Sequence, residues 1–291
     1  MAEITIDAAL CRRDGLCAMA CVREIFHREG RGEIPEITRA DSCFGCGHCV
    51  AICPSGAISH SDFPEGTVRP IESEMTPTFD QVLELIRGRR SRRLFKDAPL
   101  DREAIESILE AARFAPSGHN SQSTEFVVVQ DRDTVREIGR LTAEGMRKLA
   151  KPFRSAVGRT IMGLVMGRRK TEIIAGFAPE LEYLACQFDS GTDALLHNAP
   201  AIILFCAEDL GGFSEVNANL AVQNAALAAE ALGLGCFYTG FVVLACDRDD
   251  RIAKLLSLPE NHKVFGGLAI GHPRLSFDKW PERKPARVTW V

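Results

Sequence analysis

The sequence predicts a protein of two domains containing both helices and strands, a small cysteine-rich domain followed by a larger one. Seven of the 11 cysteines lie within the first 53 residues, which indicates that these seven share a function. Residues 60–77 carry three prolines and a glycine without apolar periodicity, which is typical of a linker or wrapping segment. A chain of 291 residues, 46% of them hydrophobic, can bury one small and one medium core.

Charge and hydropathy argue against two kinds of partner. The formal net charge is −4 and there is no basic tract of the kind that nucleic-acid binding demands, so the sequence does not predict nucleic-acid binding. No apolar run approaches the roughly 18 residues of a transmembrane helix. The first ten residues, MAEITIDAAL, also lack the basic-then-apolar plan of a signal peptide. We therefore expect a cytoplasmic protein that does not span a membrane.

The second cysteine motif has the spacing C-x2-C-x2-C-x3-C-P and consists of Cys43, Cys46, Cys49, Cys53 and Pro54. Clustered cysteines in a chain without a secretory signal indicate metal ligands rather than disulfides. In bacterial ferredoxins, three thiolates at this spacing hold one iron–sulfur cube and the fourth reaches a second cube. Zinc is the alternative, but zinc sites usually present two separated pairs of ligands.

The first cysteine motif fits the same register but has an aspartate at the second position, giving C-x2-D-x2-C-x3-C. If the last cysteine of each motif ligates the cluster of the other motif, the two motifs together predict two 4Fe-4S clusters. The predicted ligand sets are Cys11, Asp14, Cys17 and Cys53 for one cluster, and Cys21, Cys43, Cys46 and Cys49 for the other. A carboxylate is a harder ligand than a thiolate, so Asp14 predicts a labile corner and an Asp-ligated or 3Fe-4S cluster.

Residues 1–60 resemble two-cluster bacterial ferredoxins, apart from Asp14 and from Val22, where the first motif usually has proline. Some ferredoxins of this type carry an aspartate at that position, so the resemblance implies that Asp14 is a ligand. The alternative is a turn residue, because Asp14-Gly15 is good turn chemistry.

Apolar patterns predict the elements of the second domain. Residues 100–118 read as an amphipathic helix, with Asp101 as N-cap and a stop at Pro116 and Gly118. The alanine-rich helix of residues 217–235 has small residues on several sides, so we expect it to be central or at a subunit interface. Four short β-rich runs are expected to be strands, at residues 125–131, 201–209, 236–241 and 263–271.

An arginine-rich stretch, RGRRSRRLF at residues 87–95, follows the apolar VLELI. Its guanidinium groups and hydroxyl are suited to a phosphate, and the candidate residues are Arg89, Arg90, Ser91 and Arg93. A solvated basic turn is the alternative.

Four motifs in order give residues 78–291 a resemblance to the nitroreductase family of FMN enzymes. They are RRSRRLF, ARFAPSGHNSQ, AVQNAALAAEALGLGC, and GHP with an arginine downstream. The resemblance implies an α+β sandwich with an antiparallel-rich sheet, following a ferredoxin-like 2x(4Fe-4S) domain. It also implies an intertwined homodimer with two FMN sites at the subunit interface. The predicted domains are 1–60, a linker 61–77, and 78–291.

The same resemblance assigns roles to residues of this chain. Arg89, Arg90 and Ser91 are expected to hold the FMN phosphate and ribityl chain, with Arg283 returning to the phosphate. Pro116, Ser117 and Asn120 are expected to line the flavin from the partner subunit, and Tyr238, Thr239 and Gly240 to lie near the N5 edge of its ring. Ser123 and Thr124 stand where many relatives have proline and tryptophan. Residues 145–190 are expected to cap the substrate pocket, or else to form a core helix plus a loop.

The functional expectation is an FMN-dependent oxidoreductase that takes electrons through two iron–sulfur clusters and reduces a small organic acceptor such as a nitroaromatic or quinone. A ferredoxin or flavodoxin is the expected electron donor, and direct reduction by NAD(P)H stays open. Two alternatives are a specialised metabolic reductase or dehalogenase, and an iron–sulfur redox sensor without turnover.

Overall fold

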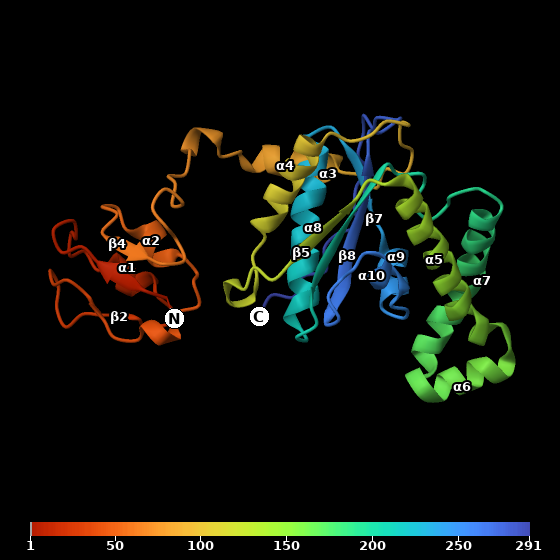
Figure 1. The fold of residues 1–291 in the computed structure, drawn as a ribbon, viewed down its shortest axis with the longest axis horizontal. Coiled ribbons are helices and arrows are strands. Elements are labelled where there is room, and N and C mark those ends of the chain that lie inside the picture. Colours follow the sequence, from red (N-terminus) through yellow and green to blue (C-terminus); the bar gives the residue numbers. More distant parts are fainter. Residues whose placement is uncertain (1) are drawn as a thin grey trace. The chain divides into compact units, whose positions relative to one another are not determined.

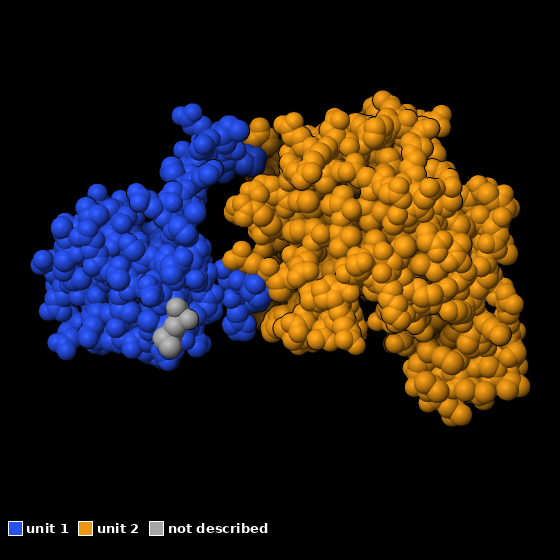
Figure 2. All heavy atoms as spheres, in the orientation of Figure 1, with its two compact units in different colours: residues 1–77, 118–121 blue, residues 78–117, 122–291 orange. Residues whose placement is uncertain are grey.

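The computed structural model describes residues 2–291, which divide into two compact units (Figure 1, Figure 2). Unit 1 runs to Pro77 and also takes in Gly118–Ser121. Unit 2 consists of Thr78–Ser117 and Gln122–Val291. No helix among residues 2–291 is both long enough and apolar enough to cross a membrane.

Unit 1 contains two short helices and two pairs of short strands. Its helices are α1 (Leu16–Ala20) and α2 (His48–Ile52), and its 3-10 turns are η1 (Ala40–Ser42) and η2 (Ser73–Met75). Strand β1 (Ile4–Ile6) pairs antiparallel with β4 (Ile58–His60), and β2 (Phe26–His27) pairs antiparallel with β3 (Glu36–Ile37). The order β1-α1-β2 is thus followed by β3-α2-β4, one half for each cysteine motif.

Equivalent glycines start the two helices of unit 1. Gly15 and Gly47 have φ angles of 74° and 75°, in the left-handed region where a side chain would be strained. The C-cap residues of the two helices are Cys21 and Cys53, the last cysteine of each motif. The same local backbone therefore presents both motifs, which explains why their spacings coincide.

The predicted linker, residues 61–77, belongs to unit 1 in the structure. The ring of Phe63 packs edge-on against His60, with 5.1 Å between ring centroids, and covers Gly47. At least the start of this segment is therefore packed against the cysteine-rich fold.

Unit 2 is built on a four-stranded antiparallel sheet in the order β5-β6-β8-β7. The strands are β5 (Glu125–Val129), β6 (Ala201–Glu208), β7 (Gly235–Tyr238) and β8 (His262–Gly271). All four lie within or overlap the predicted β-rich runs. The prediction of an α+β fold with an antiparallel sheet is confirmed.

Helices cover both faces of this sheet. Alternate residues of β6 show the division, because Ile203 packs in one core with α4 (Arg102–Arg113) and α8 (Phe213–Ala231). Ile202 packs in the other core with α5 (Arg132–Ala150) and α9 (Gly240–Cys246). Helix α8 is the predicted alanine-rich helix, and a Cβ on Gly266 of β8 would lie only 2.5 Å from Val222. Glycine at that position lets α8 approach the sheet.

The remaining helices lie at the edges of unit 2. Helix α3 (Phe79–Gly88) begins with a capping box at Thr78, and α10 (Arg251–Leu255) follows α9. The 3-10 turns are η3 (Gly118–Asn120), which belongs to unit 1, and η4 (Lys151–Arg154). Helices α6 (Ala156–Met166) and α7 (Arg168–Asp189) project from the sheet (Figure 1).

Candidate functional site

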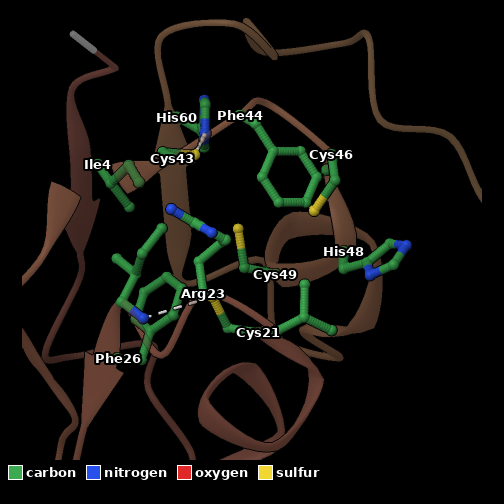
Figure 3. A pocket seen from close by; sticks show the side chains of 13 residues that line it. Ile4, Cys21, Arg23, Phe26, Cys43, Phe44, Cys46, His48, Cys49 and His60 are labelled. Carbon is green, nitrogen blue, oxygen red and sulfur yellow. Dashed lines mark hydrogen bonds between the residues drawn. The ribbon is translucent and has the colours of Figure 1, made fainter. Parts of the chain in front are cut away.

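Two cavities in unit 1 each collect sulfur atoms from both cysteine motifs. Cavity I is lined by Cys11, Asp14, Cys17 and Cys53. Cavity II is lined by Cys21, Cys43, Cys46 and Cys49 (Figure 3). The structure thus brings together the two crossed ligand sets that the spacing predicted, and it leaves none of the seven N-terminal cysteines aside.

The donors in each cavity surround a volume instead of meeting at one point. Among residues 2–291, no group of three His, Cys, Asp or Glu side chains is placed to hold a single metal ion. A four-iron cube has one ligand at each iron corner, so it needs donors spread around a cavity. Each cavity supplies four donors, the number that one such cube requires.

Backbone N–H groups point at the sulfur atoms in equivalent places of the two halves. The Ile25 amide donates to the Cys21 sulfur at 3.5 Å, and the Ala57 amide donates to the Cys53 sulfur at 3.3 Å. Such hydrogen bonds favour thiolates and are the usual outer contacts of metal-bound sulfur. The fold therefore prepares these sulfurs to act as ligands.

Burial has the opposite effect on other thiols. It raises the pKa of Cys49 to about 11 and also raises the pKa of Cys17. For Cys53, burial raises the pKa, but hydrogen bonds from Ser55 and nearby backbone amides outweigh it and the pKa falls. Because the thiolate is the form of cysteine that ligates iron, iron binding at Cys17 and Cys49 would require the loss of their protons.

Asp14 lines cavity I and also shapes the start of α1. Its Oδ1 accepts a hydrogen bond from the Leu16 amide at 3.1 Å, as expected of a turn residue. Its backbone carbonyl accepts one from Arg28 Nη1 at 3.1 Å. No hydrogen bond joins Oδ2 to another described residue, so one carboxylate oxygen supports the turn while the other is not engaged. The two interpretations of Asp14 are compatible.

In unit 2, the arginine-rich stretch lies alongside β7. Ser91 forms a parallel bridge with Cys236, and the Arg92 amide donates to the Cys236 carbonyl at 3.0 Å. The Arg93 guanidinium lies 5.5 Å from the centre of the Phe237 ring. Residues more than 140 positions apart are thereby joined, and the stretch runs beside the strand that leads to Tyr238, Thr239 and Gly240.

Arg92 is the arginine of this stretch that serves the fold. Its Nη2 donates to Glu230 Oε1 of α8 at 2.5 Å, and both side chains are mostly buried, at 13% and 16% exposed. The sequence spacing alone does not distinguish Arg92 from the other arginines of this stretch. Arg89 and Arg90 are half-buried, and Arg93 is exposed.

Thr239, like the Arg92 Nε atom of the arginine-rich stretch, has a buried polar atom without a partner, which calls for a ligand. Its side chain is 3% exposed, and its Oγ1 has no hydrogen-bond partner among residues 2–291. The backbone is fixed by the Thr239 amide, which donates to the Gly267 carbonyl at 2.9 Å. Buried hydroxyls in proteins nearly always have a partner, so a bound polar group is the natural one. Tyr238 is 44% exposed, and its hydroxyl donates to the Phe265 carbonyl at 3.3 Å.

The remaining predicted residues lie elsewhere. Pro116 and Ser117 line a separate cavity at the end of α4 with Thr124, and Ser117 Oγ accepts from the Gln122 amide at 3.0 Å. Asn120 ends η3 with a φ of 50°.

Arg283 is exposed in the C-terminal tail, and none of its contacts reaches the arginine-rich stretch. Other tail residues do reach it: Leu275 accepts from Arg92 Nη1 at 3.3 Å, and the Trp280 ring lies 4.4 Å from the Arg87 guanidinium. The tail thus passes the predicted phosphate site without placing Arg283 there.

Comparisons with known proteins agree with this division. The sequence model of the nitroreductase family matches residues 86–272, and that of a 4Fe-4S dicluster domain matches residues 3–62. A putative NADH dehydrogenase/NAD(P)H nitroreductase of Methanothermobacter thermautotrophicus is 28% identical over 66% of this chain and 77% of its own. An FMN reductase [NAD(P)H] of Bacillus subtilis is 26% identical over 67% of this chain and 66% of its own.

The fold has counterparts among solved structures. The crystal structure of a nitroreductase with bound FMN from Bacteroides fragilis has a TM-score of 0.56 and 24% identity, and covers 72% of this chain and 98% of its own. The corresponding structure from Desulfitobacterium hafniense has a TM-score of 0.53 and 24% identity, over 74% of this chain and 100% of its own. The chain therefore belongs to the nitroreductase family of FMN oxidoreductases, and a 4Fe-4S dicluster domain precedes its nitroreductase domain.

Proposed function

We propose that this chain is an FMN-dependent oxidoreductase that takes single electrons through two four-iron clusters in unit 1 and uses them to reduce a small organic acceptor, such as a nitroaromatic or a quinone. The names of its relatives, which include NAD(P)H nitroreductases and FMN reductases, support the class of reaction. The clusters favour a one-electron carrier such as a ferredoxin or flavodoxin as the donor, with NAD(P)H as a second route.

One observation carries the electron-transfer part of the proposal. Each cavity of unit 1 is lined by sulfurs of both cysteine motifs, with Cys21 joining the second motif and Cys53 joining the first. A single structural metal would need one such set at most. Two complete sets, side by side in one small fold, are suited to passing electrons between clusters.

In unit 2, the chain supplies the groups for a flavin phosphate and ring. Arg89, Arg90 and Ser91 would bind the phosphate and ribityl chain, with Arg93 adding positive charge. The unpartnered hydroxyl of Thr239, beside Tyr238 and Gly240, would contact the ring. FMN, when bound, exchanges electrons singly or in pairs, so it can join a one-electron donor to a two-electron acceptor.

A homodimer would complete this site, with Pro116, Ser117 and Asn120 coming from the partner subunit. Helix α8 supports the proposal, because it exposes Phe213, Val216 and Leu220 at helical spacing. Arg283 is then a candidate to bind the phosphate of the FMN held by either subunit, and Lys284 and Arg287 of the same tail are the alternatives.

The first test is the composition of the purified protein. Anaerobic absorption spectra, with iron, sulfide and flavin analysis, should give two four-iron clusters and one FMN per chain, followed by a screen of donors and acceptors. Clusters without FMN would instead support a redox sensor without turnover. Turnover restricted to one halogenated or metabolic acceptor would support the specialised reductase or dehalogenase.

A further inference from the structure

His60 is a buried histidine whose two ring nitrogens both have partners. It ends β4 and is 4% exposed. Its Nε2 lies 3.4 Å from the Cys43 sulfur (Figure 3), and its Nδ1 lies 3.1 Å from the Asp62 amide nitrogen. Phe63 packs against the ring, and the pairing of His60 with Ile4 fixes the backbone. The imidazole is thus held in one orientation beside a predicted cluster ligand.

The contact with Asp62 determines which nitrogen carries the proton. A backbone amide can only donate, so Nδ1 must accept and cannot be protonated. The proton of the neutral ring is then on Nε2, directed at Cys43. His60 is therefore an N–H donor to this sulfur, which also receives the Gly45 amide at 3.4 Å.

In the described part of the chain, the other half of unit 1 has no imidazole at its sulfurs; its side-chain donor is the Ser55 hydroxyl, whose Oγ lies 3.7 Å from the Cys53 sulfur. Thirty-two residues before His60 stands Arg28, at the same interval that separates Cys11 from Cys43. The Arg28 side chain donates to the Asp14 carbonyl oxygen and not to a sulfur. Within residues 2–291, the Cys11 sulfur has no hydrogen bond. The two cavities therefore differ in their side-chain donors, an imidazole 3.4 Å from Cys43 in cavity II and the more distant hydroxyl of Ser55 at Cys53 in cavity I, and Cys43 also receives an amide that Cys11 lacks.

We infer that His60 is a positioning residue that makes the cluster of cavity II the easier of the two to reduce. A hydrogen bond from an N–H group to a ligating sulfur withdraws negative charge from that sulfur. It becomes stronger when the cluster gains an electron, so it favours the reduced state of the cluster. In this step the external carrier loses one electron, the cluster gains it, and no bond is formed or broken. Electrons entering unit 1 then settle beside Cys43. This inference rests on the proposed function, because it requires both clusters.

The experiment is a redox titration of the full chain, followed by electron paramagnetic resonance. In His60→Leu, the midpoint potential of the cavity II cluster should move to a more negative value, while that of the cavity I cluster stays the same. His60→Gln should restore part of the shift, because an amide can still donate. The matched control is His48→Leu, which removes an exposed imidazole from the rim of the same cavity without a hydrogen bond to sulfur. Equal potentials in His60→Leu and wild type would overturn the inference.

A second measurement covers the case in which His60→Leu does not assemble clusters. With ¹⁵N-labelled histidine, pulsed electron paramagnetic resonance of the reduced wild-type protein should show a weak coupling between the cluster spin and a histidine nitrogen. The same coupling should remain in His48→Leu. Absence of that coupling in a wild-type protein with both clusters would contradict the inference. Absence of clusters from the wild-type protein, by iron and sulfide analysis, would instead refute the proposed function.

Discussion

The buried apolar core of unit 1 consists of seven residues, two of them the cysteines Cys17 and Cys49, whereas unit 2 has two larger cores on the faces of its sheet. Small domains bury too little apolar surface to be stable alone and commonly depend on metals. Unit 2 buries β6 on both faces. From this comparison we expect the proposed clusters of unit 1 to stabilise its fold, and the proposed FMN of unit 2 to bind a scaffold whose stability comes from its own apolar cores.

Removing iron should have the largest effect and should act on one unit only. Structural metal sites contribute on the order of 10 kcal/mol to folding, so unit 1 should unfold when its iron is chelated under anaerobic conditions. Hydrogen exchange measured by mass spectrometry should show complete loss of protection in α1, α2 and β4, with β6 and β8 unchanged. Protection of α2 and β4 that survives iron removal would show that unit 1 folds by its apolar core alone.

Removing the phosphate donors should empty the flavin site without unfolding unit 2. Each charge-assisted hydrogen bond is worth about 1.5–3 kcal/mol, so Arg89→Ala with Ser91→Ala should raise the Kd for FMN at least about tenfold. Titration with FMN, followed by flavin fluorescence, measures this change. The matched control is Arg102→Ala, on the exposed surface of α4. Full FMN retention in the double variant would refute the phosphate assignment.

Arg92→Ala should mainly lower the thermal stability of unit 2, whereas Arg89→Ala should mainly weaken FMN binding. The substitution leaves Glu230 mostly buried without its partner and should cost about 1.5–3 kcal/mol. Thermal unfolding of unit 2 should therefore begin at a lower temperature, whereas Arg102→Ala leaves it unchanged. An unaltered Tm for Arg92→Ala would show that this ion pair is not needed.

Substitutions of Asp14 should give the smallest effect, a change in the rate of iron loss. Under mild air exposure, the cluster of cavity I should become a three-iron form before that of cavity II, because a carboxylate holds iron less well than a thiolate. Asp14→Cys should slow this conversion. Asp14→Asn keeps an oxygen for the Leu16 amide but loses the charged ligand, so it should speed the conversion. Equal rates in all three proteins would leave Asp14 as a turn residue only.

The cysteine sets could be predicted because their chemistry is local. Three cysteines in one tight loop must face one volume, and crossing the fourth cysteines of two equal motifs follows from the ferredoxin spacing. The four strands and α8 could be predicted because buried β-strands and helices leave apolar patterns in the sequence. Both kinds of signal depend on intervals of a few residues.

The remaining features depend on contacts between distant residues. Nothing in the spacing of His60 relative to Cys43 indicates that its ring reaches that sulfur, because β4 brings it there. Arg92 is indistinguishable in sequence from Arg89 until α8 supplies Glu230. Arg283 was predicted from a motif in a tail without regular structure, and no tertiary contact places it at the phosphate site.

The central claim is that the clusters of unit 1 feed electrons to unit 2. The direct measurement is anaerobic turnover of the acceptor, driven in turn by a reduced ferredoxin or flavodoxin and by chemically reduced FMN, in wild type and in Cys46→Ser with Cys49→Ser. The matched control is Cys186→Ser, at an exposed cysteine of α7. The double variant should lose carrier-driven turnover while keeping FMN and its chemical reduction, and Cys186→Ser should keep both. Undiminished carrier-driven turnover in the double variant would contradict the claim.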